Sequence, residues 1–319
     1  MVTCGWEEGC VAVERHYEVN VSGVVRVSVV DSGPSAPVAT VILLHSWAMS
    51  SSVWDEVTIQ LERVSPRLRV IAYDCRGHGA SDPVDGTLTS LGDDLAAVIE
   101  RLVPDGPLVL VGHGMGGSAV LSLGLAHRDL VDDRVGGVVL VSTSAEPLVP
   151  EERQWRGFRT LSRMNTELLR RGGIPSKPAP VIRRAVRGLY GRDVDRRPVD
   201  TTIMQAAHSH PPALSSLLRD LLDVDLSPAL EAYAGKPAAV VVGGSDRVVS
   251  NQQIRRTAAE LLGSRHVLIP GAGHMLPTEC PVDLAMVIGG VALEVVGMAG
   301  SRTVGAASGR AGDEMAGDR

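Results

Sequence analysis

Two polar residues in the C-terminal third of the chain, Asp246 and His274, could act together as an acid–base pair. Each follows a short β-branched segment, Asp246 in VVGGSDRVVS and His274 in IPGAGHMLPTECP. A carboxylate that accepts a hydrogen bond from one imidazole nitrogen orients the ring and stabilises its protonated form, so the other nitrogen can act as a general base. The alternative is that folding alone holds both residues, but burying an acid–base pair that does no chemistry is costly. We therefore predict that the pair is catalytic.

The segment VLVGHGMGGSAV, residues 109–120, predicts an apolar strand, a glycine-flanked turn and the start of a helix of small residues. Gly112 and Gly116 suit a sharp strand-to-helix turn that leaves no room for side chains. The centre of the turn, where such a motif presents a nucleophile, is Gly114. Glycine has no hydroxyl, so no covalent intermediate can form at this position. The backbone amide of Met115, at the start of the helix, is still suited to hold negative charge.

The elements that must position these residues alternate along the chain. Segments dense in Val, Leu and Ile predict strands buried on both faces, at 39–45, 68–74, 107–113, 135–143, 237–244 and 265–271. Helical patterns lie at 52–64, 90–103, 115–127, 251–262 and 281–298. The alternation predicts an α/β fold with a doubly wound, mostly parallel sheet. Two weaker strands, 12–19 and 24–30, predict an antiparallel hairpin at one edge.

The alternation fails once, between the sixth and seventh predicted strands. There, helical stretches with Pro and Gly breaks predict a helical cap over residues 146–235, inserted at the end of the sheet where ligands bind. The cap divides the core into residues 12–145 and 236–298, and the small, polar residues 299–319 predict a disordered tail. The segment 281–298 contains Glu294 and several glycines, which favours a closing core helix over a membrane span.

Four separated motifs together resemble the α/β-hydrolase superfamily, in particular its esterases and C–C hydrolases. LLHSWAMSSSVWD (43–55) resembles the His-Gly loop, with Ser46 in place of the usual glycine, and YDCRGHGASD (73–82) matches Asp-x-Arg-Gly-x-Gly-x-Ser. The third motif is the turn around Gly114, and the fourth is the pair Asp246 and His274. The order elbow, acid, histidine is also that of the family. The resemblance covers residues 12–295.

The resemblance implies roles for the loops around the turn. The amides of Trp47 and Met115 would form an oxyanion hole, and Gly114 would stand at the nucleophile position without being catalytic. Ser46 and His113 would border the substrate pocket. We expect the Ser46 hydroxyl to make a hydrogen bond to solvent or backbone, since motif position alone does not establish a catalytic role.

Composition narrows the class of protein and of partner. The 319 residues are 44% hydrophobic and 21% charged with a formal charge of −6, which is typical of a soluble globular protein. Aromatics are only 3%, and no motif indicates nucleic-acid binding. We see no signal peptide, and the four cysteines lack metal-ligand spacing, so we expect a cytoplasmic protein with reduced thiols and no metal or cofactor. Residues 151–200 contain twelve Arg and one Lys against six acidic residues, which would attract an acidic or carrier-bound substrate.

These observations predict an enzyme that acts on a small, acidic or carrier-bound carbonyl substrate by non-covalent general-base catalysis. A lyase, a cyclase or isomerase, and a hydrolase using water all fit that description. One alternative is a catalytically inactive pseudo-hydrolase that binds a ligand or partner. Another is a serine esterase whose nucleophile was changed to Gly114, in which Gly114→Ser would restore ester hydrolysis. We expect a small-molecule substrate, no membrane partner and no nucleic acid; the oligomeric state cannot be read from the sequence.

Overall fold

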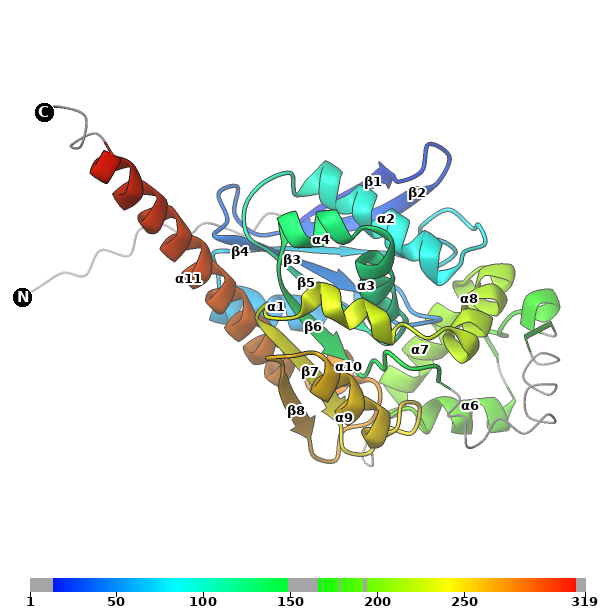
Figure 1. Ribbon diagram of the computed structural model, residues 1–319. Coiled ribbons are helices and arrows are strands. Elements are labelled where there is room, and N and C mark those ends of the chain that lie inside the picture. The colour runs from blue at the N-terminus through cyan, green and yellow to red at the C-terminus, as the bar shows by residue number, and fades with distance from the viewer. Residues whose placement is uncertain (1–13, 149–165, 168, 178, 192–193, 314–319) are drawn as a thin grey trace, which may run out of the picture.

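A single eight-stranded sheet forms the centre of the protein. The computed structural model describes residues 14–148, 166–167, 169–177, 179–191 and 194–313 (Figure 1). The sheet has the strand order β1-β2-β4-β3-β5-β6-β7-β8. The strands are β1 (Arg15–Asn20), β2 (Arg26–Ser32), β3 (Ala39–Leu44), β4 (Leu68–Tyr73), β5 (Leu108–His113), β6 (Val135–Val141), β7 (Ala238–Gly243) and β8 (Arg265–Ile269).

The sheet is parallel except at one edge. β1 pairs antiparallel with β2, and β2 antiparallel with β4, whereas every later pairing is parallel. β3, β5 and β7 are buried at every position, because helices cover both faces of the sheet. The predicted doubly wound, mostly parallel sheet with an antiparallel edge hairpin is therefore confirmed.

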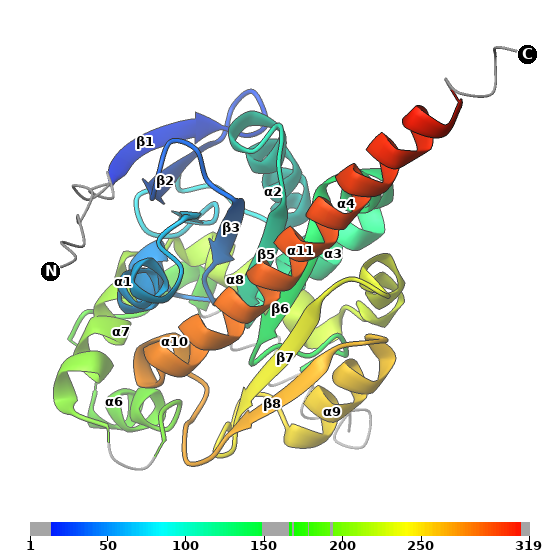
Figure 2. The same cartoon turned by 90° about the vertical axis from the view of Figure 1, so that its left-hand side faces the viewer.

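Helices cover the two faces in separate groups (Figure 2). α1 (Asp55–Val64) and α11 (Pro281–Asp313) pack on one face. The other face carries α2 (Leu88–Leu102), α3 (Met115–Ala126), α4 (Arg128–Arg134) and α9 (Asn251–Glu260). The side chains of Thr87 and Ser250 each accept a hydrogen bond from the third helical amide, which fixes the starts of α2 and α9. The short α4 is absent from the sequence prediction.

The last helix is longer than the sequence predicts. α11 continues to Asp313, so residues 299–313 are helical where we expected the disordered tail to begin. Extending an existing helix adds one hydrogen bond per residue and avoids the cost of nucleation, which lets a weakly patterned segment continue the helix. Among the described helices, α11 alone is apolar and long enough, over Pro281–Ser301, to cross a membrane. Its residues Leu284, Ile288 and Val291 are completely buried within the fold.

The insertion after β6 is helical, as predicted. Its described part contains α6 (Pro180–Arg187), α7 (Arg196–His208) and α8 (Pro211–Asp223), which lie beyond the carboxyl ends of the parallel strands (Figure 1). The 3-10 helix η3 (Ser227–Tyr233) instead packs on α3, where Tyr233 donates a hydrogen bond to the Val120 carbonyl. Residues 149–165 of the predicted cap lie outside the described residues, and its limits at 146 and 235 stay a prediction.

Candidate active site

The turn between β5 and α3 has the sharp geometry that its glycines predict. Gly114 has a φ of +51°, in the left-handed region that favours glycine. A Cβ on Gly112 would lie 2.3 Å from the Gly117 amide nitrogen, and a Cβ on Gly116 would lie 2.3 Å from the Leu44 carbonyl oxygen. The strand and helix therefore pack too closely for any side chain at the two flanking positions.

Asp246 and His274 form the predicted pair in the loops after β7 and β8. His274 Nδ1 donates a hydrogen bond of 3.0 Å to Asp246 Oδ2, and the two side chains are 7% and 0% exposed. Burial opposes ionisation of Asp246, but hydrogen bonds from His274 and from the amides of Val248 and Val249 outweigh it and lower the pKa of the carboxyl. His274 Nε2 faces the turn, because a Cβ on Gly114 would lie 3.4 Å from it. The imidazole nitrogen of His274 that does not contact the ionised Asp246 therefore lies beside position 114.

Glu279 holds the loop that carries His274. Its carboxylate accepts hydrogen bonds from the amides of Gly273 at 3.0 Å and Met275 at 3.1 Å, on either side of the base. It also accepts one from the amide of Gly191, in the insertion, at 2.7 Å. Glu279 was not among the site residues predicted from the sequence. The signal that could have found it is an acidic residue five positions after the histidine, within reach of the amides of a glycine-rich loop.

The amides of Trp47 and Met115 are available to a ligand. Neither donates a hydrogen bond within the part of the chain that the structure describes, and both residues line the cavity that His274 enters. The loop of Trp47 is anchored at Ala48, whose amide donates to His78 Nε2 at 3.2 Å. The Trp47 indole donates a 2.9 Å hydrogen bond to the Leu214 carbonyl of α8. Two uncommitted amides beside a base are what an oxyanion hole requires.

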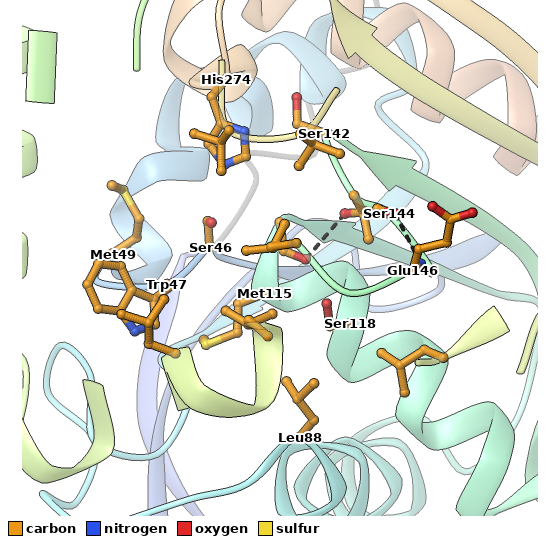
Figure 3. A pocket seen from close by; sticks show the side chains of 18 of the residues that line it. Ser46, Trp47, Met49, Leu88, Met115, Ser118, Ser142, Ser144, Glu146 and His274 are labelled. Atoms are coloured by element: carbon orange, nitrogen blue, oxygen red, sulfur yellow. Dashed lines mark hydrogen bonds between the residues drawn. The ribbon is translucent and has the colours of Figure 1, made fainter. Parts of the chain in front are cut away.

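The cavity at this site has a volume of about 240 Å³ (Figure 3). Its wall is mostly aliphatic, with His274 and Glu146 as its charged or titratable groups in the described part of the chain. The described wall contains no Arg or Lys, and the cap residues Arg170 and Arg171 pair with Glu167 instead. The wall therefore gives no support to attraction of an acidic group into the cavity.

His113 does not border the cavity, contrary to expectation. It is completely buried and its Nε2 donates a 2.8 Å hydrogen bond to the carbonyl of His274. Burial, and then the neighbouring His274, lower the pKa of His113 to about 3, so its ring stays neutral. Alternate residues of a strand share a face, and His113 lies on the face of Val109 and Val111, which pack toward α11. His113 therefore contacts the backbone of His274 and not the cavity.

Ser46 borders the cavity, as expected, and its hydroxyl lies next to Gly114, which the sequence does not reveal. A Cβ on Gly114 would lie 2.3 Å from Ser46 Oγ, so the two residues compete for one place. Among the described residues Ser46 accepts hydrogen bonds through its carbonyl, from His45 and Met49, and makes none through Oγ, so of the expected solvent or backbone contact the backbone half is not found. A serine introduced at position 114 would therefore require the Ser46 hydroxyl to move.

Comparison with known proteins gives the same fold. A profile described as the alpha/beta hydrolase family matches residues 41–287. A 2-(acetamidomethylene)succinate hydrolase of Mesorhizobium japonicum is 30% identical over 244 residues, covering 75% of this chain and 83% of the relative. A pimeloyl-(acyl-carrier protein) methyl ester esterase of Vibrio campbellii is 26% identical over 197 residues, 60% of this chain and 71% of the relative. The malate-bound structure of a thermophilic esterase from Thermogutta terrifontis aligns with a TM-score of 0.72 at 23% identity, covering 88% of this chain and 99% of that one.

Proposed function

The chain belongs to the alpha/beta hydrolase family, and from that premise we propose that it is an enzyme whose Asp246–His274 pair acts as a general base on a small carbonyl substrate. The observation that carries the proposal is the direction of His274 Nε2, toward the place left open by Gly114 and beside two uncommitted amides. An Asp–His pair that had lost its catalytic role would need neither this orientation of Nε2 nor two free amides beside it. The proposal requires no bond between substrate and residue 114.

The chemistry follows from the polarity of the site. The amides of Trp47 and Met115 hold the carbonyl oxygen and stabilise the negative charge that develops on it. His274 Nε2 removes a proton from the group placed beside Gly114, either a carbon next to the carbonyl or a water, while Asp246 stabilises the imidazolium. Elimination, isomerisation, cyclisation and hydrolysis by water all begin with this step.

The names of the relatives indicate a substrate class. One is named for the hydrolysis of a succinate derivative and the other for a methyl ester on an acyl carrier protein. We propose a similar substrate here, acidic or carrier-bound, whose uncharged part enters the aliphatic cavity while the acidic group or the carrier stays outside. We also propose that the reaction takes place in the cytoplasm, where free thiols such as those of Cys75 and Cys280 persist.

The test is turnover of a panel of short esters, thioesters, lactones and β-keto acids by wild type and His274→Ala. We expect the variant to lose a factor of about 10²–10⁴ in kcat, the usual contribution of a general base. His266→Ala, which removes an exposed histidine of β8, is the matched control and should keep wild-type turnover. Turnover that survives His274→Ala would refute the proposal, and ligand binding without turnover would favour an inactive pseudo-hydrolase.

A further inference from the structure

The hydroxyl of Ser46 occupies the space in which a side chain at residue 114 would lie. A Cβ on Gly114 would be 2.3 Å from Ser46 Oγ and 3.1 Å from Ser46 Cβ. Non-bonded heavy atoms do not pack at 2.3 Å without displacement of one of them. A side chain at 114 would therefore require the Ser46 hydroxyl to move, and in this chain the loop after β3 fills that place in the cavity.

That place lies beside the base. The Cβ position on Gly114 is 3.4 Å from His274 Nε2, the nitrogen that does not contact Asp246. Figure 3 shows the Ser46 hydroxyl in the cavity on the side of the His274 ring. Within the described residues Ser46 makes hydrogen bonds only through its carbonyl, so no described group other than a substrate or His274 competes for the Oγ proton. In structures without substrate, hydrogen bonds to a catalytic base are often long or poorly aligned, and they tighten in the substrate complex.

The backbone of Ser46 is held firmly. The buried His45 donates a 2.8 Å hydrogen bond from Nδ1 to the Ser46 carbonyl, and its Nε2 accepts one from the Cys75 amide at 2.9 Å. The Met49 amide donates to the same carbonyl at 3.2 Å. The next residue in the chain is Trp47, whose amide is one of the two candidate oxyanion donors. If Ser46 attacked a carbonyl, the oxyanion would therefore form next to the Trp47 amide, which the same loop holds in place.

The residue types at the two positions are exchanged relative to the family pattern. The His-Gly loop and the Gly-x-Ser-x-Gly elbow place glycine at 46 and serine at 114, and this chain has Ser46 and Gly114. Loss of the elbow serine alone would leave a glycine at 46. Across positions 46 and 114 the exchange instead keeps one hydroxyl and one glycine, in swapped places.

We propose that Ser46 is a nucleophile and that the chain catalyses acyl transfer from an ester, thioester or lactone to water. This inference rests on the proposed function, because it uses the same base and oxyanion site and names the hydroxyl on which the base acts. Ser46 Oγ attacks the carbonyl carbon while His274 Nε2 accepts the hydroxyl proton, and the carbonyl electron pair becomes the oxyanion held by Trp47 and Met115.

The remaining steps return the enzyme to its starting state. The oxyanion collapses and expels the alcohol or thiol, which takes its proton from His274 Nε2 and leaves the acyl group as an ester on Ser46. Water then attacks this ester and gives a proton to Nε2, and that proton returns to Ser46 Oγ as the carboxylic acid departs. The aliphatic wall, which includes Leu221, Leu226 and Val249, fits an uncharged, apolar acyl group.

A fluorophosphonate probe tests the nucleophile without knowledge of the natural substrate, since it phosphonylates an activated serine with loss of fluoride. We expect tandem mass spectrometry of wild type to find one adduct, on Ser46. Ser46→Ala should abolish labelling, and His274→Ala should slow it by at least about 100-fold through loss of the base. Ser50→Ala, in the same loop but outside the cavity wall, should label at the wild-type rate.

Two outcomes overturn the inference: no adduct at Ser46 in wild type, or labelling and ester turnover that persist in Ser46→Ala. Either leaves the general-base function standing if His274→Ala still abolishes turnover, so the two failures are distinguishable. Thermal melting checks that each variant folds. If Ser46→Ala does not fold, Ser46→Cys keeps a group of similar size, and iodoacetamide should alkylate position 46 at a rate that falls at least tenfold when His274→Ala is added. An unchanged rate would refute the inference.

Discussion

The combination of Gly114→Ser with Ser46→Gly tests the claim that both positions compete for one place. Alone, Gly114→Ser puts a Cβ at 2.3 Å from Ser46 Oγ, at a residue whose φ is +51°. With Ser46→Gly added, the nearest hydroxyl is gone while the backbone angle is unchanged. We therefore expect the double variant to be more stable than Gly114→Ser alone, although it carries one substitution more.

The loss of folding stability expected for Gly114→Ser has two contributions. A side chain at the φ of Gly114 costs about 1–2 kcal/mol, whichever residue is at position 46. Rotation of the Ser46 hydroxyl relieves its 2.3 Å contact but not the 3.1 Å contact with Ser46 Cβ, and this remaining overpacking adds about 1–3 kcal/mol, which Ser46→Gly removes. The free energies of unfolding of the four proteins in the double-mutant cycle should therefore show a favourable coupling of about 1–3 kcal/mol between the substitutions.

Urea denaturation of wild type, both single variants and the double variant measures this coupling. Gly106→Ser is the matched control, because Gly106 also has a positive φ, +83°, but a Cβ there would contact nothing within 4 Å. Its cost should add to that of Ser46→Gly within about 0.5 kcal/mol. If Gly114→Ser and Ser46→Gly are also additive within that margin, the two positions do not compete and the reasoning is wrong.

Two further predictions concern groups around the base. His78 and His113 are buried with pKa values of about 3, so below pH 6.5 the unfolded chain binds protons that the folded chain does not. The free energy of unfolding should then fall by about 1.4 kcal/mol per pH unit for each histidine as the pH drops below 6.5, and urea denaturation that is flat between pH 7 and 5.5 would contradict this. Glu279→Gln weakens the acceptor that holds the loop of His274, so we expect a loss of about 1–3 kcal/mol in stability. It should also reduce kcat with little change in KM, and a variant with wild-type kcat would show that Glu279 does not position the base.

The fold was predictable because its central strands are buried on both faces. Residues 107–112 are a continuous apolar run followed by His113, and the structure has β5 at Leu108–His113, so the pattern predicted the strand nearly to its ends. The end of α11 was not predictable in this way, because residues 299–313 have no periodic pattern and their helix continues from the preceding turns. Periodicity reports which face is buried and does not report where a helix stops.

The candidate site was predictable only in part. The order and spacing of the motifs predicted that Asp246 and His274 would meet, and they do. The same motifs misplaced His113, because a position in a motif does not specify which side of the sheet a side chain occupies. The close approach of Ser46 and Gly114 brings together the loops after β3 and β5, and no local sequence pattern contains the distance between two loops.

The crowding between positions 46 and 114 also restricts how such an arrangement can evolve. A glycine codon such as GGC and a serine codon such as AGC differ by a single base, so each replacement is easy, but two replacements need an intermediate. An ancestor with glycine at 46 and serine at 114 would pass through either two serines or two glycines. The first would crowd two side chains into one place and lose stability, and the second would pack well but carry no hydroxyl. A lineage that followed the second route would have spent time as a protein with a base, an oxyanion site and no nucleophile.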